Sequence, residues 1–364
     1  MKSKIEKIRQ YMQKEGLDGY LVFNFESSDR VNQRYLINFS SSLGSVLVGM
    51  DQALFLTDSR YIDSAVEEIS ALEVKKIESK QLEETVDQIS EMGFKKVGID
   101  ENSVSVGTFE DLNDALDDAV ELVPVDGPIP DIRICKSNQE LNLHQRAAEI
   151  ADDTFAYLMD FVEPGMTESE VALESEFFMR NHGAESISFD PIVAAGSNSA
   201  VPHARPGDKT VQKGEILLID MGAKYEGYCS DMTRTVFIGE PTEKMEEIYA
   251  IVLEAQKAGL AALGPGVSTK EVDSKAREII EDHGYGDNFG HGLGHGVGLE
   301  IHEKPRLAQT EDSQLRQGMV VTVEPGIYLP EWGGVRIEDM VRITEDGYQF
   351  FSRSPKEEVI NPLG

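Results

Sequence analysis

The second half of the chain contains one pattern twice, at positions 101 residues apart. Residues 164–171 read PGMTESEV, and residues 265–272 read PGVSTKEV. Each copy is predicted to begin a helix with a capping box and to end it at a His-Gly pair, because glycine commonly follows a helix C-terminus. The residues concerned are Thr167 with Glu170, Ser268 with Glu271, His182-Gly183 and His283-Gly284. An internal repeat of this kind predicts two similar units packed together, with a site between them.

Each copy of the repeat also carries two carboxylates that the spacing places across a β-hairpin. Asp220 follows the apolar run 216–219, and the β-branched segment after it contains Asp231. With Tyr225 and Glu226 as a two-residue loop, Asp220 is predicted to lie directly opposite Asp231. Like charges in that position destabilise a pair of strands. A cation between the two carboxylates would remove the repulsion.

The second carboxylate pair follows the first at an offset of 104 residues for its first member. Glu324 ends the apolar run 320–323, and Glu324 and Glu338 are symmetric about Glu331. Four solvated carboxylates are the simpler alternative, but it is disfavoured because Asp220 and Glu324 both end buried-type runs. The two pairs together predict a divalent metal cluster.

A glycine-rich segment with histidines lies between the two pairs. Residues 290–302 read GHGLGHGVGLEIH, and glycine lets the backbone approach a ligand closely. No Gly-Lys-Ser/Thr follows, which argues against a phosphate loop. The histidines that concern the site are His203, His291, His295 and His302.

Four carboxylates with one or two imidazoles form a ligand set that is mostly oxygen. Such a set suits Mn²⁺ and tolerates Co²⁺, Fe²⁺ or Zn²⁺, and four acids can neutralise two divalent ions. A two-metal site predicts hydrolysis, in which an activated water attacks a carbonyl while metals and histidines stabilise the oxyanion. Glu324 is a candidate for moving the proton.

Composition restricts the partners and the compartment. The net charge of −32 argues against nucleic acid or an anionic membrane as a partner. The sequence has no apolar run of transmembrane length and no apolar stretch resembling a signal peptide near its start. Cys135 and Cys229 are too few and too scattered for a disulfide framework, so we expect a cytoplasmic protein.

The chain is expected to have two domains. Residues 1–123 alternate between helical and strand patterns and are predicted to form an α/β unit. Residues 124–135 contain three prolines and are interpreted as a linker. A capping-box pattern at Ser137 and Glu140 then begins the second domain, residues 136–364.

The combined motifs resemble the pita-bread metallopeptidases, family M24, over the whole chain. The catalytic motifs that carry the resemblance are DMGA and GYCSDMTRT around Asp220 and Asp231, GHGVG at 294–298, HE at 302–303, VEPG at 323–326 and VRIED at 335–339. Residues 32–44 and 57–61 resemble the amino-terminal domain of the Xaa-Pro peptidases, prolidase and aminopeptidase P. The resemblance implies an α+β protein: a creatinase-type α/β domain followed by a pita-bread domain with an internal pseudo-twofold repeat.

The resemblance also assigns roles to residues. It implies five metal ligands with none missing, Asp220, Asp231, His295, Glu324 and Glu338. It implies that His203, His291 and His302 orient the substrate and stabilise the tetrahedral intermediate, and that Arg336 steadies Asp231. By the same resemblance we expect two divalent ions, with Mn²⁺ favoured, and a homodimer in which the amino-terminal domain limits access to the cleft.

The expected substrate is a short peptide with proline second, cleaved before that proline. The sequence leaves open whether the enzyme is an Xaa-Pro dipeptidase or an Xaa-Pro aminopeptidase. A methionine-aminopeptidase-like activity is disfavoured by the long amino-terminal domain. A peptide-binding relative without activity is disfavoured by the complete ligand set.

Overall fold

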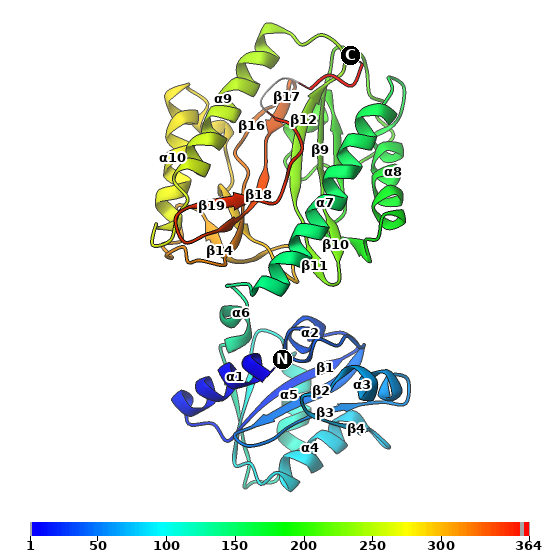
Figure 1. The fold of residues 1–364 in the computed structure, drawn as a ribbon, viewed down its shortest axis with the longest axis vertical. Coiled ribbons are helices and arrows are strands. Elements are labelled where there is room, and N and C mark those ends of the chain that lie inside the picture. The colour runs from blue at the N-terminus through cyan, green and yellow to red at the C-terminus, as the bar shows by residue number, and fades with distance from the viewer. Residues whose placement is uncertain (1, 357–359, 364) are drawn as a thin grey trace. The chain divides into compact units, whose positions relative to one another are not determined.

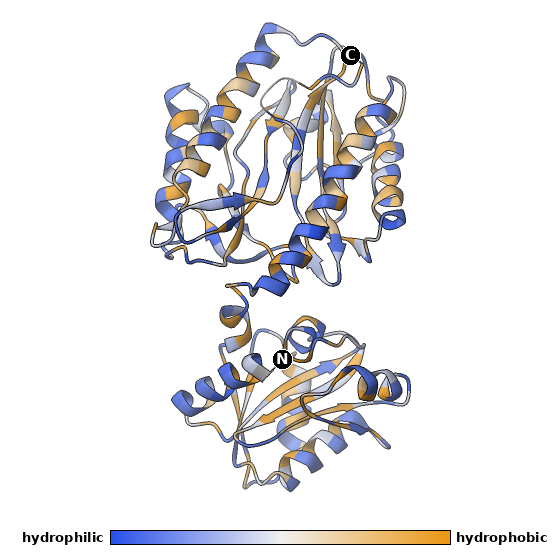
Figure 2. Cartoon of the chain, viewed as in Figure 1, coloured by the Kyte–Doolittle hydropathy of each residue, from blue (hydrophilic) through white to orange (hydrophobic). Residues whose placement is uncertain are grey.

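The computed structural model describes residues 2–356 and 360–363, and the chain divides into two compact units, Met1–Arg133 and Ile134–Gly364 (Figure 1). In both units apolar residues gather on the strands and on the helix faces turned toward them (Figure 2). Among the described residues, no helix is long and apolar enough to cross a membrane. Each unit is considered separately below.

The first unit is built on a six-stranded mixed sheet with the strand order β4-β3-β2-β1-β5-β6. Its strands are β1 (Gly19–Phe25), β2 (Leu43–Gly49), β3 (Ala53–Thr57), β4 (Glu73–Lys76), β5 (Lys96–Asp100) and β6 (Glu121–Val125). Its helices are α1 (Lys2–Glu15), α2 (Arg30–Ile37), α3 (Ile62–Glu68), α4 (Gln81–Glu91), α5 (Val106–Ala115) and α6 (Pro128–Ile132). The alternation of helix and strand predicted for this part of the chain is confirmed.

The second unit places its strands between two pairs of packed helices (Figure 1). The helices are α7 (Asn138–Phe161), α8 (Glu168–Asn181), α9 (Glu243–Ala261) and α10 (Thr269–Asp282), with two short 3₁₀ turns, η1 (Gly196–Ala200) and η2 (Gly286–Asn288). The strands of the first copy of the repeat are β7 (Ser186–Ile187), β8 (Ile192–Ala195), β9 (Ile216–Met221), β10 (Ala223–Tyr225), β11 (Tyr228–Cys229) and β12 (Met232–Phe237). Those of the second are β13 (Gly294–Gly296), β14 (Glu303–Leu307), β15 (Val320–Val323), β16 (Gly326–Leu329), β17 (Gly333–Arg336), β18 (Asp339–Ile343) and β19 (Tyr348–Phe350).

The predicted ends of the two repeat helices are confirmed. Helix α8 is capped at its C-terminus by His182 and α10 by His283, and each imidazole Nδ1 lies 2.8 Å from a carbonyl one turn earlier. Gly183 and Gly284 follow with φ values of 104° and 82°, which a residue with a side chain adopts only at a cost. These two histidines therefore terminate helices, as the sequence indicated.

The capping boxes predicted at the helix N-termini are confirmed only in part. Both bonds of the predicted capping box are present at Ser137 with Glu140 and at Thr167 with Glu170. The predicted box at Ser268 is wrong: its hydroxyl accepts from the Lys270 amide at 3.2 Å and donates to Asp312 at 2.6 Å. The Ser268 hydroxyl thus donates to Asp312, whereas in the other copy the Thr167 hydroxyl donates to Glu170 of the box itself.

The first hairpin has a different register from the one predicted. Asp220 pairs with Thr233 rather than with Asp231, and Tyr225 pairs with Tyr228. The loop is therefore Glu226-Gly227, with positive φ values of 43° and 86°, as a two-residue turn of type I′ requires. The shift is two residues, so Asp231 stays on the same face as Asp220.

The register predicted for the second hairpin is confirmed. Val323 pairs with Asp339 and Gly326 pairs with Arg336, so the intervening Glu324 and Glu338 lie opposite each other. The strands are interrupted at this point, and the Ile337 amide donates to the Pro325 carbonyl at 3.4 Å. The two glutamates thus occupy a break between β15–β18 and β16–β17.

Candidate metal centre

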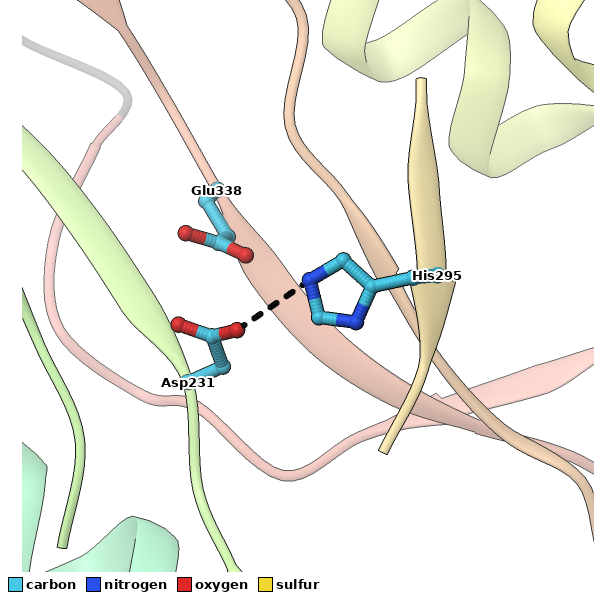
Figure 3. Close-up of side chains that lie close together, drawn as sticks. All are labelled: Asp231, His295 and Glu338. Carbon is cyan, nitrogen blue, oxygen red and sulfur yellow. Dashed lines mark ion pairs between the residues drawn. The ribbon is translucent and has the colours of Figure 1, made fainter. Parts of the chain in front are cut away.

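Three side chains from both copies of the repeat converge on one point. Ligand atoms of Asp231, His295 and Glu338 all lie within 4.8 Å of one another (Figure 3). His295 Nε2 is 3.4 Å from Asp231 Oδ2 and 3.3 Å from Glu324 Oε1. Its Nδ1 lies 3.0 Å from the Gly296 carbonyl, which assigns the proton to Nδ1 and leaves the Nε2 lone pair facing the carboxylates. This tautomer is the one that a metal ligand needs.

The carboxylates of this cluster are too close to remain ionised together without a counter-charge. Burial, followed by repulsion from Glu338, Asp220 and Glu324, raises the pKa of Asp231 well above its usual value. Burial, followed by Glu324 and Asp220, does the same to the pKa of Glu338. Burial raises the pKa of Glu324 to about 7. A divalent cation among these groups would reverse the shifts.

Some carboxylate oxygens of this region accept hydrogen bonds, and others have no hydrogen-bond partner among the described residues. Asp220 Oδ2 accepts from Arg336 at 2.7 Å, and Glu338 Oε2 accepts from the Thr233 hydroxyl at 2.7 Å. The other oxygens, Asp220 Oδ1 and Glu338 Oε1, are buried with no hydrogen-bond partner in the described part of the chain. A buried, unpaired carboxylate oxygen is costly, so its presence in two residues of this region fits a bound metal ion.

Arg336 has a different partner from the expected one. Its guanidinium binds Asp220, not Asp231, and also donates to Thr233 Oγ1 at 3.0 Å and to the Tyr328 hydroxyl at 2.8 Å. Asp231 is not hydrogen-bonded to Arg336 among the described contacts; burial raises the pKa of Asp231, and the charge of Arg336 opposes that rise, so an electrostatic supporting role toward Asp231 stays a prediction. The arginine fork therefore spans Asp220 and Thr233.

The other predicted site histidines surround the cluster. His291 Nε2 lies 2.9 Å from the Tyr328 hydroxyl, and burial lowers the pKa of His291 to about 4, so the ring is neutral. The His302 ring packs edge-on against His295 at a centroid distance of 4.4 Å. His203 is exposed, and it lies close enough to His291, His302 and Glu324 to interact with them electrostatically. The four carboxylates and four imidazoles predicted for the centre, together with Arg336, thus belong to one region.

Some residues of this region were not predicted. Tyr328 links His291 to Arg336, and Thr233 links Arg336 to Glu338. Thr233 was detectable, because it lies two residues after Asp231 on the same strand face. Tyr328 gave no such signal, because its partners come from a distant loop and from the facing strand.

The catalytic motifs and the domain order match known family models. Residues 142–345 match the model of metallopeptidase family M24. The chain belongs to this family. Residues 4–135 match the creatinase/prolidase amino-terminal domain. Membership implies peptide-bond hydrolysis that depends on a divalent metal.

Relatives of similar length cover nearly the whole chain. An uncharacterized peptidase of Bacillus subtilis, YqhT, is 43% identical over 98% of this chain and 99% of its own length. An Xaa-Pro dipeptidase of Pyrococcus horikoshii is 40% identical over the same shares. The structure of an Xaa-Pro dipeptidase from Bacillus anthracis superposes with a TM-score of 0.94 at 41% identity, covering 98% of this chain and 99% of that one. An X-Pro aminopeptidase from Thermotoga maritima gives 0.91 at 37% identity, covering 96% and 99%. These matches confirm the predicted pita-bread fold with its creatinase-type amino-terminal domain.

Proposed function

We propose that the protein hydrolyses the peptide bond between an amino-terminal residue and a following proline, using two divalent metal ions. The observation that carries the proposal is the buried carboxylate cluster: ligand atoms of Asp231, His295 and Glu338 lie within 4.8 Å of one another, and Asp220 and Glu338 each have one buried oxygen without a hydrogen-bond partner among the described residues. The printed names of the relatives, Xaa-Pro dipeptidase and X-Pro aminopeptidase, support the substrate class.

The residues that we assign to the metals are the five predicted ligands: Asp220, Asp231, His295, Glu324 and Glu338. This set has four carboxylates and one imidazole, for which Mn²⁺ is the preferred ion and Co²⁺, Fe²⁺ or Zn²⁺ are alternatives. Bound ions would supply a water molecule of lowered pKa as the nucleophile. We place this chemistry in the second unit, predicted as residues 136–364, after a domain predicted as 1–123 and a linker at 124–135.

The remaining side chains act on the substrate and on the proton. We assign proton transfer to Glu324, whose carboxylate lies 3.3 Å from His295 Nε2. His203 and His302 are exposed at the edge of the cluster, where a substrate carbonyl can reach them. His291 and Arg336 both bind the Tyr328 hydroxyl, so together they fix the wall of the site beside Asp220.

Cleavage of two matched peptides tests the proposal. The metal-free protein is loaded with Mn²⁺ or Co²⁺ and given Ala-Pro, Ala-Pro-Ala and, as a control, Ala-Ala-Ala. Cleavage before proline is expected, and no cleavage of either proline peptide with either ion would contradict the proposal. Cleavage of Ala-Pro alone identifies a dipeptidase, whereas cleavage of Ala-Pro-Ala identifies an aminopeptidase.

We also propose that the protein forms a homodimer, as the resemblance to Xaa-Pro peptidases implies. Light scattering coupled to size exclusion measures the molar mass directly. A mass near that of a single 40.3 kDa chain at micromolar concentration would contradict this part of the proposal.

A further inference from the structure

One ion pair on helix α10 binds three backbone groups of the segment that carries His291. Arg277 Nη1 donates to the Phe289 carbonyl at 3.0 Å, and Nη2 donates to the His291 carbonyl at 2.8 Å. Asp273 Oδ1 accepts from the Leu293 amide at 3.0 Å. The segment 289–293 is therefore bound at every second residue by two side chains.

The ion pair itself is built to be rigid. Arg277 Nε and Nη2 each bind one oxygen of Asp273 at 2.9 Å, a two-point contact between residues one turn apart. The Asp273 side chain is fully buried and that of Arg277 is 14% exposed. The guanidinium also lies 4.2 Å from the centroid of the Phe289 ring. Because these contacts fix the plane of the guanidinium, the two carbonyls that it binds have little freedom to move.

The segment held in this way leads to the metal centre by two routes. His291 Nε2 binds the Tyr328 hydroxyl, which accepts from Arg336, and Arg336 binds Asp220. The Leu293 carbonyl accepts from the Glu324 amide at 2.8 Å. A displacement of this segment would therefore be passed to a carboxylate of each hairpin.

We propose that Asp273 and Arg277 are positioning residues for the active site, which set the place of His291 and through it of Tyr328 and Arg336. The proposal rests on the proposed function, since His291 and Arg336 belong to its site. Neither Asp273 nor Arg277 touches the carboxylate cluster, so both act through the segment 289–293. If the carbonyls of Phe289 and His291 lose Arg277 as their donor, this glycine-rich segment can shift. Small displacements of positioned catalytic groups lower the reaction rate by large factors.

The first copy of the repeat offers a matched control. Arg180 on α8 binds Glu176, also one turn away, at 2.9 Å and donates to the Glu185 carbonyl at 3.2 Å. Its side chain is 48% exposed, and the segment that follows α8 carries none of the proposed site residues. The two ion pairs are therefore comparable in kind. We propose a positioning role for the pair with Arg277 and none for the pair with Arg180.

The test compares Arg277→Met, Arg277→Lys and Arg180→Met in the metal-loaded enzyme. We expect kcat/KM for the proline peptide to fall about 10–100-fold in both Arg277 variants, the range typical of residues behind a metal site. Lysine keeps the charge and most of the stem but has no fork, so it should not rescue the activity. Arg180→Met should remain within about twofold of the wild type, a change of under half a kcal/mol in the barrier.

Two further measurements separate positioning from general damage to the fold. Amide hydrogen exchange of the peptide covering 289–294 should accelerate in the Arg277 variants, while exchange of α7 and α8 stays unchanged. In a His291→Ala background, Arg277→Lys should lower kcat/KM by a smaller factor than in the wild-type background, because only the route through Leu293 and Glu324 then remains. An equal loss in both backgrounds, or full activity of Arg277→Lys, would overturn the proposal.

The proposed function and this inference fail in different ways. If the wild type cleaves no proline peptide, the proposed function is lost. If the wild type is active and the Arg277 variants keep its kcat/KM although segment 289–294 exchanges faster, the positioning role alone is lost.

Discussion

The two copies of the repeat hold their central carboxylates by different chemistry. In the first copy, Asp220 accepts from the guanidinium of Arg336, which comes from the second copy. In the second copy, Glu338 accepts from the neutral hydroxyl of Thr233, which comes from the first. Each copy thus donates a hydrogen bond to a carboxylate of the other, but only the donor from the second copy, Arg336, carries a positive charge. We expect a cation from solution to balance the remaining carboxylates of the cluster.

Removing a carboxylate or the imidazole at the centre should have the largest effect. We expect Asp231→Asn and His295→Ala each to lower turnover by more than about 100-fold, beyond the loss typical of residues that only support a ligand. Steady-state kinetics with Mn²⁺ measure the turnover, and mass spectrometry measures the metal content of each variant. Glu226→Gln, in the exposed turn of the same hairpin, is the control. Retained turnover in either variant would remove that residue from the ligand set.

The difference between the two supporting contacts should appear in the stability of the metal-free protein. Arg336→Met leaves a buried carboxylate without its charge partner, and we expect a loss of about 3–5 kcal/mol in the free energy of unfolding. Thr233→Val removes the neutral donor to Glu338 and the acceptor of Arg336 Nε, and it should cost about 1–3 kcal/mol. Urea unfolding in the presence of chelator measures both. Equal losses would show that the charge of Arg336 gives Asp220 no special support.

The burial of Glu324, together with repulsion from Asp220, should give a pH-dependent difference between the wild type and Glu324→Gln. The pKa of Glu324 is raised to about 7 in the folded protein, so its ionised form destabilises the metal-free fold above that pH. This cost disappears as pH falls through 7 toward the unfolded value, because the folded state then takes up the proton. At pH 8 the metal-free glutamine variant should be more stable than the wild type by about 1–3 kcal/mol, and at pH 5 nearly equal.

Saturating Mn²⁺ should reverse the sign of that difference. The metal binds the ionised carboxylate of the wild type and stabilises only the folded state, whereas glutamine offers a weaker ligand. Unfolding curves are measured at both pH values with and without metal, so that the metal-free protein is the control for the metal-loaded one. A difference that does not change with pH would mean that the surroundings of Glu324 do not disfavour its ionised form.

The carboxylate centre could be predicted from the sequence because its signals are local. Asp220 and Glu324 end apolar runs, and the register at Glu324 followed correctly from the loop around Glu331. The register at Asp220 was missed because the loop begins one residue later, at Glu226, than was assumed. The dipeptide Glu226-Gly227 was the available signal, since a type I′ turn favours glycine in its second position. The error was two residues, so the face of the strand was still correct.

The supporting contacts could not be predicted, because they join residues far apart in the chain. Arg336 binds Asp220 across 116 positions and Thr233 binds Glu338 across 105. Periodicity tells which face of a strand a side chain occupies, but not which donor of another element it meets. The pairing of Asp273 with Arg277 is local, yet its contact with the segment 289–293 depends on the packing of α10.

The helix starts of the two copies give the smallest predicted effect and test how far the repeat extends. Thr167 makes both bonds of a capping box with Glu170, whereas Ser268 accepts one amide bond and otherwise binds Asp312. Thr167→Ala should therefore lower the free energy of unfolding by about 1 kcal/mol, and Ser268→Ala by about 0.5 kcal/mol. Thermal unfolding of the metal-loaded protein measures the difference. Equal shifts would mean that the contact with Asp312 replaces the missing half of the box, and Asp312→Ala in the Ser268→Ala background would then cause no further loss.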